Sequence, residues 1–252
     1  MRRTGIFLVV LSLLLLALPV LAQEESGPIT RVFVDKAKTG MEQQYEEAVK
    51  QHIAWHREQG DTWNWVVRRI ESGENFGQYL WITSGHRWED FDNPAVPSDE
   101  DGAHFDSGAG QYLESSTSVF TRYLADVSRP LEGDTPAAVT SAIFFQIHRG
   151  KGDEFMTAVK KVHQAIEKTN WPRNYFWLAL VSGGYHPTYV LVFQEENWAG
   201  LNPPEKSFEA MLEEAYGKQE AEEIQKVFDR TIKSERSQIS VYRPDLSYIP
   251  GQ

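Results

Sequence analysis

The sequence contains no cysteine, and this absence removes several kinds of chemistry at once. There is no thiol nucleophile, no disulfide, no thiolate metal site and no cysteine to carry a lipid. An oxidising compartment is therefore tolerated but not exploited. After residue 21 the chain also lacks any second apolar run long enough to cross a bilayer.

Positive charge is scarce as well. The chain has 25 Lys and Arg residues against 36 Asp and Glu residues, a formal net charge of −11. Such a surface repels phosphate backbones and anionic headgroups, so we expect no nucleic-acid partner and no membrane partner. A phosphate loop, a dinucleotide fingerprint and a Gly-x-Ser-x-Gly elbow are all missing, so neither nucleotide binding nor a serine hydrolase is supported.

The N-terminus has the pattern of a secretory signal. Arg2 and Arg3 precede an apolar run that ends in Val20-Leu21-Ala22 before an acidic segment. We therefore predict a signal peptide over residues 1–22 and an exported protein, periplasmic or secreted. Loss of the two arginines leaves 23 basic against 36 acidic side chains, a net charge of −13. An uncleaved anchor is the alternative, because the run is near the lower limit for a membrane span.

The mature chain repeats itself. Residues 29–94 align with residues 139–204 at a constant offset of 110 positions, without a gap. Identical pairs include Gly40/Gly150, Ala48/Ala158, Val49/Val159, Lys50/Lys160, Gly73/Gly183, Tyr79/Tyr189 and Trp88/Trp198. Internal similarity at a fixed period indicates repeated structural units. We predict a first unit over residues 29–127, a linker over residues 128–138 and a second unit over residues 139–247.

Hydrophobic periodicity predicts the same order of elements in both units. In the first unit we expect strands at 29–36, 63–70, 79–83 and 118–124, a helix at 41–59, a loop at 92–110 and a short helix near 111–116. In the second we expect strands at 139–147, 175–181, 188–194 and 238–242, and helices at 153–169 and 204–235, the latter broken near Gly217. This β-α-β-β-α-β order is ferredoxin-like.

Both faces of the second sheet carry apolar side chains, including Ile143, Phe145, Trp177 and Leu191, so both faces must be covered. Two such sheets in one chain can close on each other. In this order and pattern the chain resembles the dimeric α+β barrel superfamily, and within it the NIPSNAP, stress-responsive A/B-barrel and antibiotic-biosynthesis-monooxygenase families. The resemblance implies an α+β fold in which two tandem units form an intramolecular barrel, a pseudo-dimer. It also allows haem as a cofactor, although fold alone does not assign an activity.

The strongest candidate for chemistry is His52-Ile-Ala-Trp55-His56. Histidines four apart on a helix share one face, and here that face should point at the sheet. The paired positions of the second unit hold Val162 and Ile166. Such a pair can bind a metal, serve haem or move protons, but the sequence shows no third ligand and no His-Glu-x-x-His motif. We therefore assign no metal. Two buried histidines bonded to their neighbours are the alternative.

Aromatic side chains gather in the first unit. Trp55, Trp63, Trp65 and Trp81 bring a polar handle to an apolar wall, which suits a pocket for a flat or apolar molecule. Ordinary packing of aromatic side chains in a small barrel is the alternative, and the recurrence of Tyr79 and Trp88 as Tyr189 and Trp198 favours it. Trp63, Trp65 and Trp81 are not tryptophan in the second unit, where Arg173, Tyr175 and Leu191 stand, so they are the better ligand candidates.

Further candidates are single residues. Arg68 and Arg69 lie on opposite strand faces, and an inward arginine could bind a carboxylate or enolate oxygen, whereas an edge position needs no ligand. We retain Arg69 and His86 as ligand-binding candidates. His104 lies in an acidic loop that could act as a lid but lacks the spacing of a calcium-binding loop. His148, His163 and His186 are expected at the surface.

Two functions remain open from the sequence. In the first, an exported barrel binds a small apolar or aromatic ligand in its first unit, and the second unit is structural. In the second, the protein is a monooxygenase-type or haem-handling oxidoreductase that uses His52 or His56 as a base or axial ligand.

Overall fold

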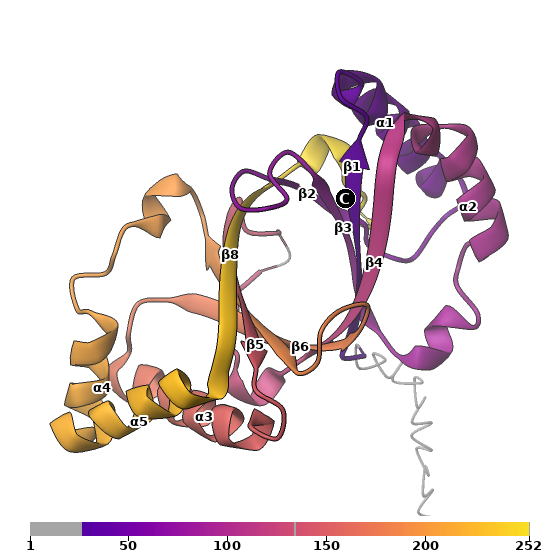
Figure 1. The fold of residues 1–252 in the computed structure, drawn as a ribbon. Coiled ribbons are helices and arrows are strands. Elements are labelled where there is room, and N and C mark those ends of the chain that lie inside the picture. The colour runs from indigo at the N-terminus through magenta and orange to yellow at the C-terminus, as the bar shows by residue number, and fades with distance from the viewer. Residues whose placement is uncertain (1–26, 134, 252) are drawn as a thin grey trace, which may run out of the picture.

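The computed structural model describes residues 27–133 and 135–251, so the signal peptide predicted at residues 1–22 lies outside the described part. Eight antiparallel strands form a closed barrel in the order β1-β3-β2-β8-β5-β7-β6-β4, and helices pack outside it at two sides (Figure 1). The expected mixed α+β architecture is confirmed. None of the helices in these two ranges is both long and apolar enough to cross a membrane.

Each half of the chain supplies four neighbouring strands of the barrel. The first half contains β1 (Ile29–Ala37), α1 (Glu42–Glu58), β2 (Val66–Ile70), β3 (Tyr79–His86), η1 (Trp88–Phe91), α2 (Ser98–Ser107), η2 (Ala109–Tyr112), β4 (Leu113–Tyr123) and η3 (Ala125–Val127). The second contains β5 (Val139–Ile147), α3 (Gly152–Thr169), β6 (Asn174–Ser182), β7 (Thr188–Glu195), η4 (Trp198–Leu201), α4 (Phe208–Tyr216), α5 (Lys218–Thr231), β8 (Ile232–Tyr242) and η5 (Pro244–Leu246).

Two seams join the halves, where β2 pairs with β8 and β4 pairs with β6. A hairpin glycine packs against each seam. Gly73 has a φ of 90°, and a Cβ there would meet Ser237 O at 2.7 Å; Gly183 has a φ of 93°, and a Cβ would meet Ser118 O at 2.5 Å. Only glycine combines this backbone conformation with so close an approach. The matched glycines of the sequence therefore lie where each half contacts the last strand of the other.

The hydrophobic cores lie between the helices and the strands of each half. One core joins α3, α4 and α5 to β6 and β7, with Phe155, Trp177 and Met211 among its buried members. The other joins α1 to β2 and β3, with Tyr45, Trp65 and Trp81 among its buried members. Three candidate tryptophans of the first half belong to the core under α1, since Trp65 and Trp81 are buried members and Trp63 packs against them.

Four sequence-based assignments are wrong. The loop predicted at residues 92–110 contains α2, and the short helix expected near residues 111–116 is η2 followed by β4. The helix predicted to reach residue 235 ends at Thr231, because β8 begins at Ile232 and pairs with β5 from there. The strand expected from Trp63 begins at Val66. The predicted linker is also partly ordered, since Arg129 and Tyr175 exchange two backbone hydrogen bonds of 2.8 Å.

Candidate metal centre

The histidine pair lies on the buried face of α1. This face carries Tyr45, Val49, His52 and His56 at helical spacing, and it packs on the outer side of the barrel strands. His52 is only 4% exposed and His56 only 1% exposed. The orientation expected from the sequence is thus the observed one, and two imidazoles occupy positions that would normally hold apolar side chains.

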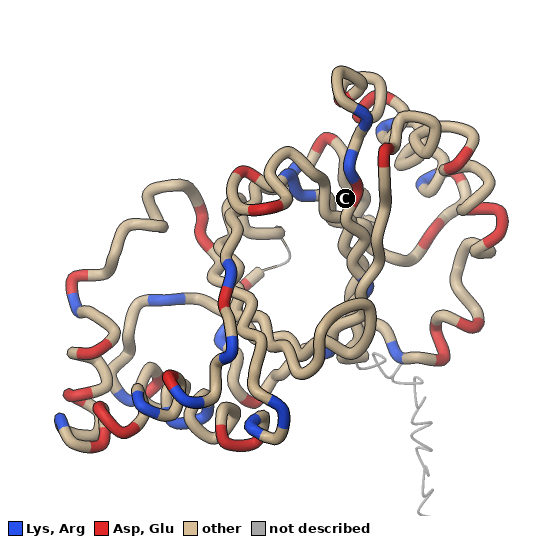
Figure 2. Tube along the Cα trace, in the orientation of Figure 1, with Lys and Arg blue, Asp and Glu red and all other residues tan. Residues whose placement is uncertain are grey.

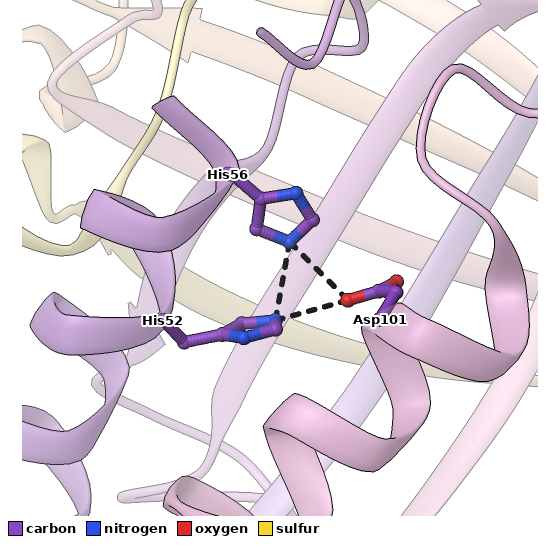
Figure 3. Close-up of side chains that lie close together, drawn as sticks. All are labelled: His52, His56 and Asp101. Carbon is purple, nitrogen blue, oxygen red and sulfur yellow. Dashed lines mark hydrogen bonds and ion pairs between the residues drawn. The ribbon is translucent and has the colours of Figure 1, made fainter. Parts of the chain in front are cut away.

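The helix α2 brings a carboxylate to this pair. Asp101 Oδ1 lies 3.2 Å from His52 Nε2 and 3.4 Å from His56 Nε2, and the two Nε2 atoms are 3.1 Å apart (Figure 3). The three donor atoms therefore form a nearly equilateral triangle. Its members come from two helices that pack against each other, since His52 and His56 belong to α1 and Asp101 to the first turn of α2.

The other ring nitrogens of the pair already have partners. His56 Nδ1 lies 2.9 Å from Asp61 Oδ2, as an ion pair whose alignment is too poor for a hydrogen bond. His52 Nδ1 lies 2.9 Å from His104 Nδ1 on α2, so one ring donates to the other. Asp61 itself accepts hydrogen bonds from Trp65 Nε1 and the Trp63 amide, both at 2.9 Å. These contacts fix both rings with Nε2 directed at the same point.

The charges of the cluster are set by its contacts. Burial lowers the pKa of His56, but contacts with Asp101 and Asp61 outweigh this and raise it to about 9. Burial lowers the pKa of His52, and its hydrogen bond to Asp101 offsets only part of that effect. Burial raises the pKa of Asp101, but its hydrogen bonds to the two histidines dominate and hold that pKa well below its usual range. At neutral pH the metal-free cluster thus holds a cationic His56 between two carboxylates, beside a neutral His52.

Several predicted ligand residues surround this triangle. The Trp55 ring is stacked on the His104 ring, with centroids 4.6 Å apart. The ring centroid of Trp65 lies 5.5 Å from that of His56. The Trp81 ring lies edge-on to the His52 ring, with their centroids 6.2 Å apart. Trp65 and Trp81 are buried members of the hydrophobic core, so their rings serve as packed walls of the site.

Trp63 and His86 form a neighbouring contact, not part of the triangle. Their ring centroids are 4.0 Å apart, and His86 Nε2 lies 2.6 Å from Thr83 Oγ1. The Trp63 ring centroid lies 6.4 Å from that of Trp65, and the Trp63 backbone amide donates to Asp61 Oδ1 at 2.9 Å. These two predicted residues are therefore next to the centre without supplying a donor atom to it.

The predicted arginine candidates lie elsewhere. Arg69 is partly exposed and forms an ion pair with Glu71 at 3.6 Å. Arg68 is the inward arginine, and its guanidinium donates to Ser240 Oγ at 3.0 Å and to Ala137 O at 2.9 Å. Arg68 therefore ties β2 to the strands of the other half and is not presented to a ligand.

Among the other histidines, His148 and His186 are exposed as expected, but His163 is half-buried and lies 2.8 Å from Tyr175 Oη. Open surface cavities lie beside α1 and beside α3. The larger, of about 570 Å³, lies between α1 and η2 and is lined by polar residues such as Gln44, Gln51 and Gln111. The other, of about 280 Å³, lies between α3 and α5. Neither is lined by a member of the triangle.

Sequence reasoning missed Asp101 and Asp61, and it named His104 only as part of an acidic loop that could act as a lid. The separation of Asp101 from His52 and His56 along the chain does not indicate that they meet, because Asp101 lies on a helix in a segment that was expected to be a loop. The available signal was the start of α2, where Pro97 precedes the acidic run Asp99, Glu100 and Asp101 (acidic positions are red in Figure 2). Acidic residues are enriched in the first turn of a helix because their negative charge interacts favourably with the positive end of the helix dipole.

The geometry fits a metal ion. Imidazole nitrogen and carboxylate oxygen bind first-row metals at about 2.0–2.2 Å, so two donors of one ion are separated by about 3.0 Å at a 90° angle and by about 3.4 Å at a tetrahedral angle. The observed separations of 3.1, 3.2 and 3.4 Å span this interval. Within the two described ranges, His52, His56 and Asp101 are the one group of three donors close enough to share an ion.

Comparisons with known proteins identify the fold. No family model matches the sequence, and no curated protein matches it either. Among solved structures, the chain is similar to a putative monooxygenase from Lactobacillus acidophilus NCFM, with 10% identity, a TM-score of 0.55 and coverage of 89% of this chain and 97% of the other.

Two further structures are similar to the same extent. An anthrone oxidase-like protein has 12% identity and a TM-score of 0.52, over 91% of this chain and 95% of its own. A mutant chlorite dismutase from Candidatus Nitrospira defluvii has 9% identity and a TM-score of 0.54, over 88% and 96%. At such identities the likeness concerns fold alone, and it agrees with the mixed α+β architecture of the chain.

Proposed function

We propose that the protein binds one divalent first-row transition-metal ion through His52 Nε2, His56 Nε2 and Asp101 Oδ1. The observation that carries this proposal is the triangle of donor atoms, with sides of 3.1, 3.2 and 3.4 Å. The sequence alone led to no metal assignment because it offered only two donors. The Nδ1 atoms of the two histidines lie 2.9 Å from Asp61 Oδ2 and from His104 Nδ1, which supports the proposal, since histidines that bind a metal usually have a polar partner at their other ring nitrogen.

The donor set narrows the choice of metal. Two imidazoles and a carboxylate on one side of an ion are typical of mononuclear iron(II) sites and also suit zinc, cobalt and manganese. Without cysteine the site cannot offer the thiolates that favour copper(I) or iron–sulfur clusters. Three protein ligands leave one to three positions of the ion open for water or a substrate.

Charge balance also supports a cation at this point. The metal-free cluster binds a proton on His56, whose pKa is raised to about 9, between the carboxylates of Asp61 and Asp101. A divalent ion that displaces this proton leaves two neutral imidazoles, two carboxylates and two positive charges. The buried cluster then has no net charge, which is the arrangement of lowest desolvation penalty.

Haem does not fit this arrangement. A porphyrin provides four ligands to iron and leaves only two axial positions, which lie on opposite faces. Here three donors converge on one point, and each Nε2 atom is within 3.4 Å of the other histidine and of Asp101. Neither histidine therefore has the free face that an axial ligand needs.

We propose an oxidoreductase acting on a small molecule as the activity of the centre. An ion with open positions and a lining of indole rings suits oxidation of an apolar or aromatic compound. The solved structures of similar fold include proteins described as a putative monooxygenase and as anthrone oxidase-like, which makes this class of reaction compatible with the scaffold.

We further propose that the protein is exported by residues 1–22 and that its two halves act as a pseudo-dimer, with the second half as the structural support.

Metal titration tests the proposal. The purified protein is stripped with EDTA, and Co²⁺, Zn²⁺ and anaerobic Fe²⁺ are added in a calorimeter. We expect one ion per chain, and a loss of about 100-fold or more in affinity for Asp101→Asn and for His52→Val. His163→Gln is the matched control, because His163 is a half-buried helical histidine in the other half. A wild-type protein that binds no ion, or variants that bind as well as wild type, would refute the metal site.

A further inference from the structure

We infer that Arg31 forms a carboxylate-binding subsite beside the metal centre, and that the substrate is therefore a small organic acid with an apolar or aromatic body. This inference rests on the proposed metal site. Arg31 lies on β1, and its strand neighbours are Thr83 on β3 and Phe120 on β4. Its guanidinium carbon is 4.3 Å from the centroid of Phe33 and 5.2 Å from that of Phe120.

The position of Arg31 connects it with the centre. Phe33, beneath the guanidinium, packs against Trp65 at 6.5 Å, and Trp65 packs against His56 at 5.5 Å. A continuous wall of aromatic rings therefore runs from the metal ligands to the guanidinium, on the same outer side of the barrel.

The guanidinium has donors to spare. In the described ranges its hydrogen bonding is limited to Nε, which donates to Ser118 Oγ at 3.2 Å, and no Asp or Glu forms an ion pair with it. Burial lowers the pKa of Arg31, and the charge of Asp101 restores only part of that loss. Both terminal nitrogens, with four N–H groups, remain available to an anion. A planar guanidinium binds a carboxylate through two parallel hydrogen bonds.

Two other half-buried arginines, Arg173 and Arg243, already have carboxylate partners. Arg173 has Glu195 and two backbone carbonyls, and Arg243 holds Glu46 and Asp245. In the second half the position paired with Arg31 by the offset of 110 is Ser141. Unlike these two arginines, Arg31 has no carboxylate partner in the described ranges, and the residue at its matched position is a neutral side chain.

The surroundings define the chemical class of the ligand. The guanidinium would hold the carboxylate, the partly buried rings of Phe33 and Phe120 beside it would contact an apolar or aromatic body, and the open positions of the ion would receive the far end. A neutral molecule of the same shape would lose the charge-assisted hydrogen bonds. Each such bond is worth about 1.5–3 kcal/mol, which corresponds to a factor of about 10 or more in affinity.

A cobalt-loaded protein provides the test. Benzoate is titrated into the Co²⁺ form, and its binding is followed through the visible d–d spectrum, with benzamide as the neutral comparison. We expect benzoate to bind at least about tenfold more tightly than benzamide, and Arg31→Met to weaken benzoate by about tenfold or more while the affinity for Co²⁺ changes by less than about threefold. Arg69→Met, at a partly exposed arginine of β2, is the control and should leave both affinities unchanged.

The outcomes separate this inference from the metal proposal. If the wild-type protein takes up no cobalt, both fail. If it takes up cobalt but Arg31→Met binds benzoate as well as wild type, only the carboxylate subsite fails and the metal site stands. Arg31→Lys guards against a folding defect, because it keeps the charge and most of the length; it should bind benzoate with an intermediate affinity. Equal benzoate affinity for this variant and wild type would show that bidentate recognition is not used.

Discussion

The helices α1 and α3 occupy equivalent places on the two halves of the barrel, but they bury different chemistry. The buried face of α3 carries Phe155, Val159 and Ile166, whereas the matching face of α1 carries Tyr45, Val49 and His56. Both helices pack on their own strands (Figure 1). The helix α3 packs on its strands through apolar side chains alone. The fold therefore does not require the imidazoles of α1, and their presence needs a separate reason.

The same contrast extends to the surroundings of the two helices. At the offset of 110, Asp35 pairs with Phe145 and Asp61 pairs with Trp171. The helix that covers α1 is α2, whose first turn is acidic, while α3 is covered by α4 and α5 with buried Met211, Leu212 and Ile224. The polar residues of the first half thus form two groups, one around Tyr45 and one around the histidine pair, which meet where the Trp81 ring lies edge-on to His52. Buried polar networks reduce stability unless every member is satisfied, so their retention points to function.

The largest effect is expected from placing a histidine where the second half has an aliphatic residue. Ile166→His puts an imidazole into an apolar core that offers no carboxylate like Asp61 or Asp101. We expect a loss of about 3–5 kcal/mol in the free energy of unfolding, measured by urea denaturation, from the lost apolar burial and the unpaired polar ring. A loss below about 1 kcal/mol would mean that the α3 side tolerates polar groups and that the contrast has no energetic basis.

The pH dependence of the metal-free protein should follow His56. Its pKa is about 9 in the folded protein, above the ordinary 6.5, so its contribution to stability is complete below pH 6.5 and is lost as the pH rises through 9. The loss should be no more than about 3–4 kcal/mol, since one pKa unit corresponds to about 1.4 kcal/mol. Denaturation at several pH values in EDTA measures it. His56→Gln should flatten the curve between pH 6.5 and 9, and an unchanged curve would contradict the assignment.

Metal binding should stabilise the folded protein, and this stabilisation should depend on the ligands of the first half. At a free metal concentration of 100 times Kd the free energy of unfolding should increase by about 2.7 kcal/mol. The measurement is a thermal melt with and without Zn²⁺, repeated for Asp101→Asn, in which the increase should disappear, and for His163→Gln, in which it should persist. Equal stabilisation of Asp101→Asn and wild type would place the bound ion elsewhere on this acidic protein.

Much of the difference between the two halves could be predicted from the sequence. The strand at residues 139–147 was predicted with its observed ends, and α1 within one residue at each end, because apolar periodicity there is strong. For the same reason the inward direction of His52 and His56 could be predicted. The offset between the halves also indicated which half carries the unusual side chains.

The missing part of the site depends on tertiary contacts. The segment Ser98–Ser107 has no apolar stripe, and none of its residues is fully buried, so nothing in its pattern predicts α2. Its position is fixed by the contacts of Asp101 and His104 with α1, which join residues about fifty positions apart. The start of β8 was missed for a related reason, since Lys233, Glu235 and Arg236 are strand residues through their pairing with β5.

The smallest expected effect concerns the hydroxyl of Tyr45, which distinguishes it from Phe155. Tyr45 Oη donates to Asp35 Oδ2 at 2.9 Å and accepts from Trp81 Nε1 at 2.8 Å. Tyr45→Phe copies the second half but leaves both partners without this hydrogen bond, so we expect a loss of about 1–3 kcal/mol. The double variant Tyr45→Phe with Asp35→Phe removes the buried carboxylate too and should recover part of the loss. If the single variant were as stable as wild type, the polar contacts under α1 would be interchangeable with apolar packing, and the difference between the halves would narrow to the metal ligands themselves.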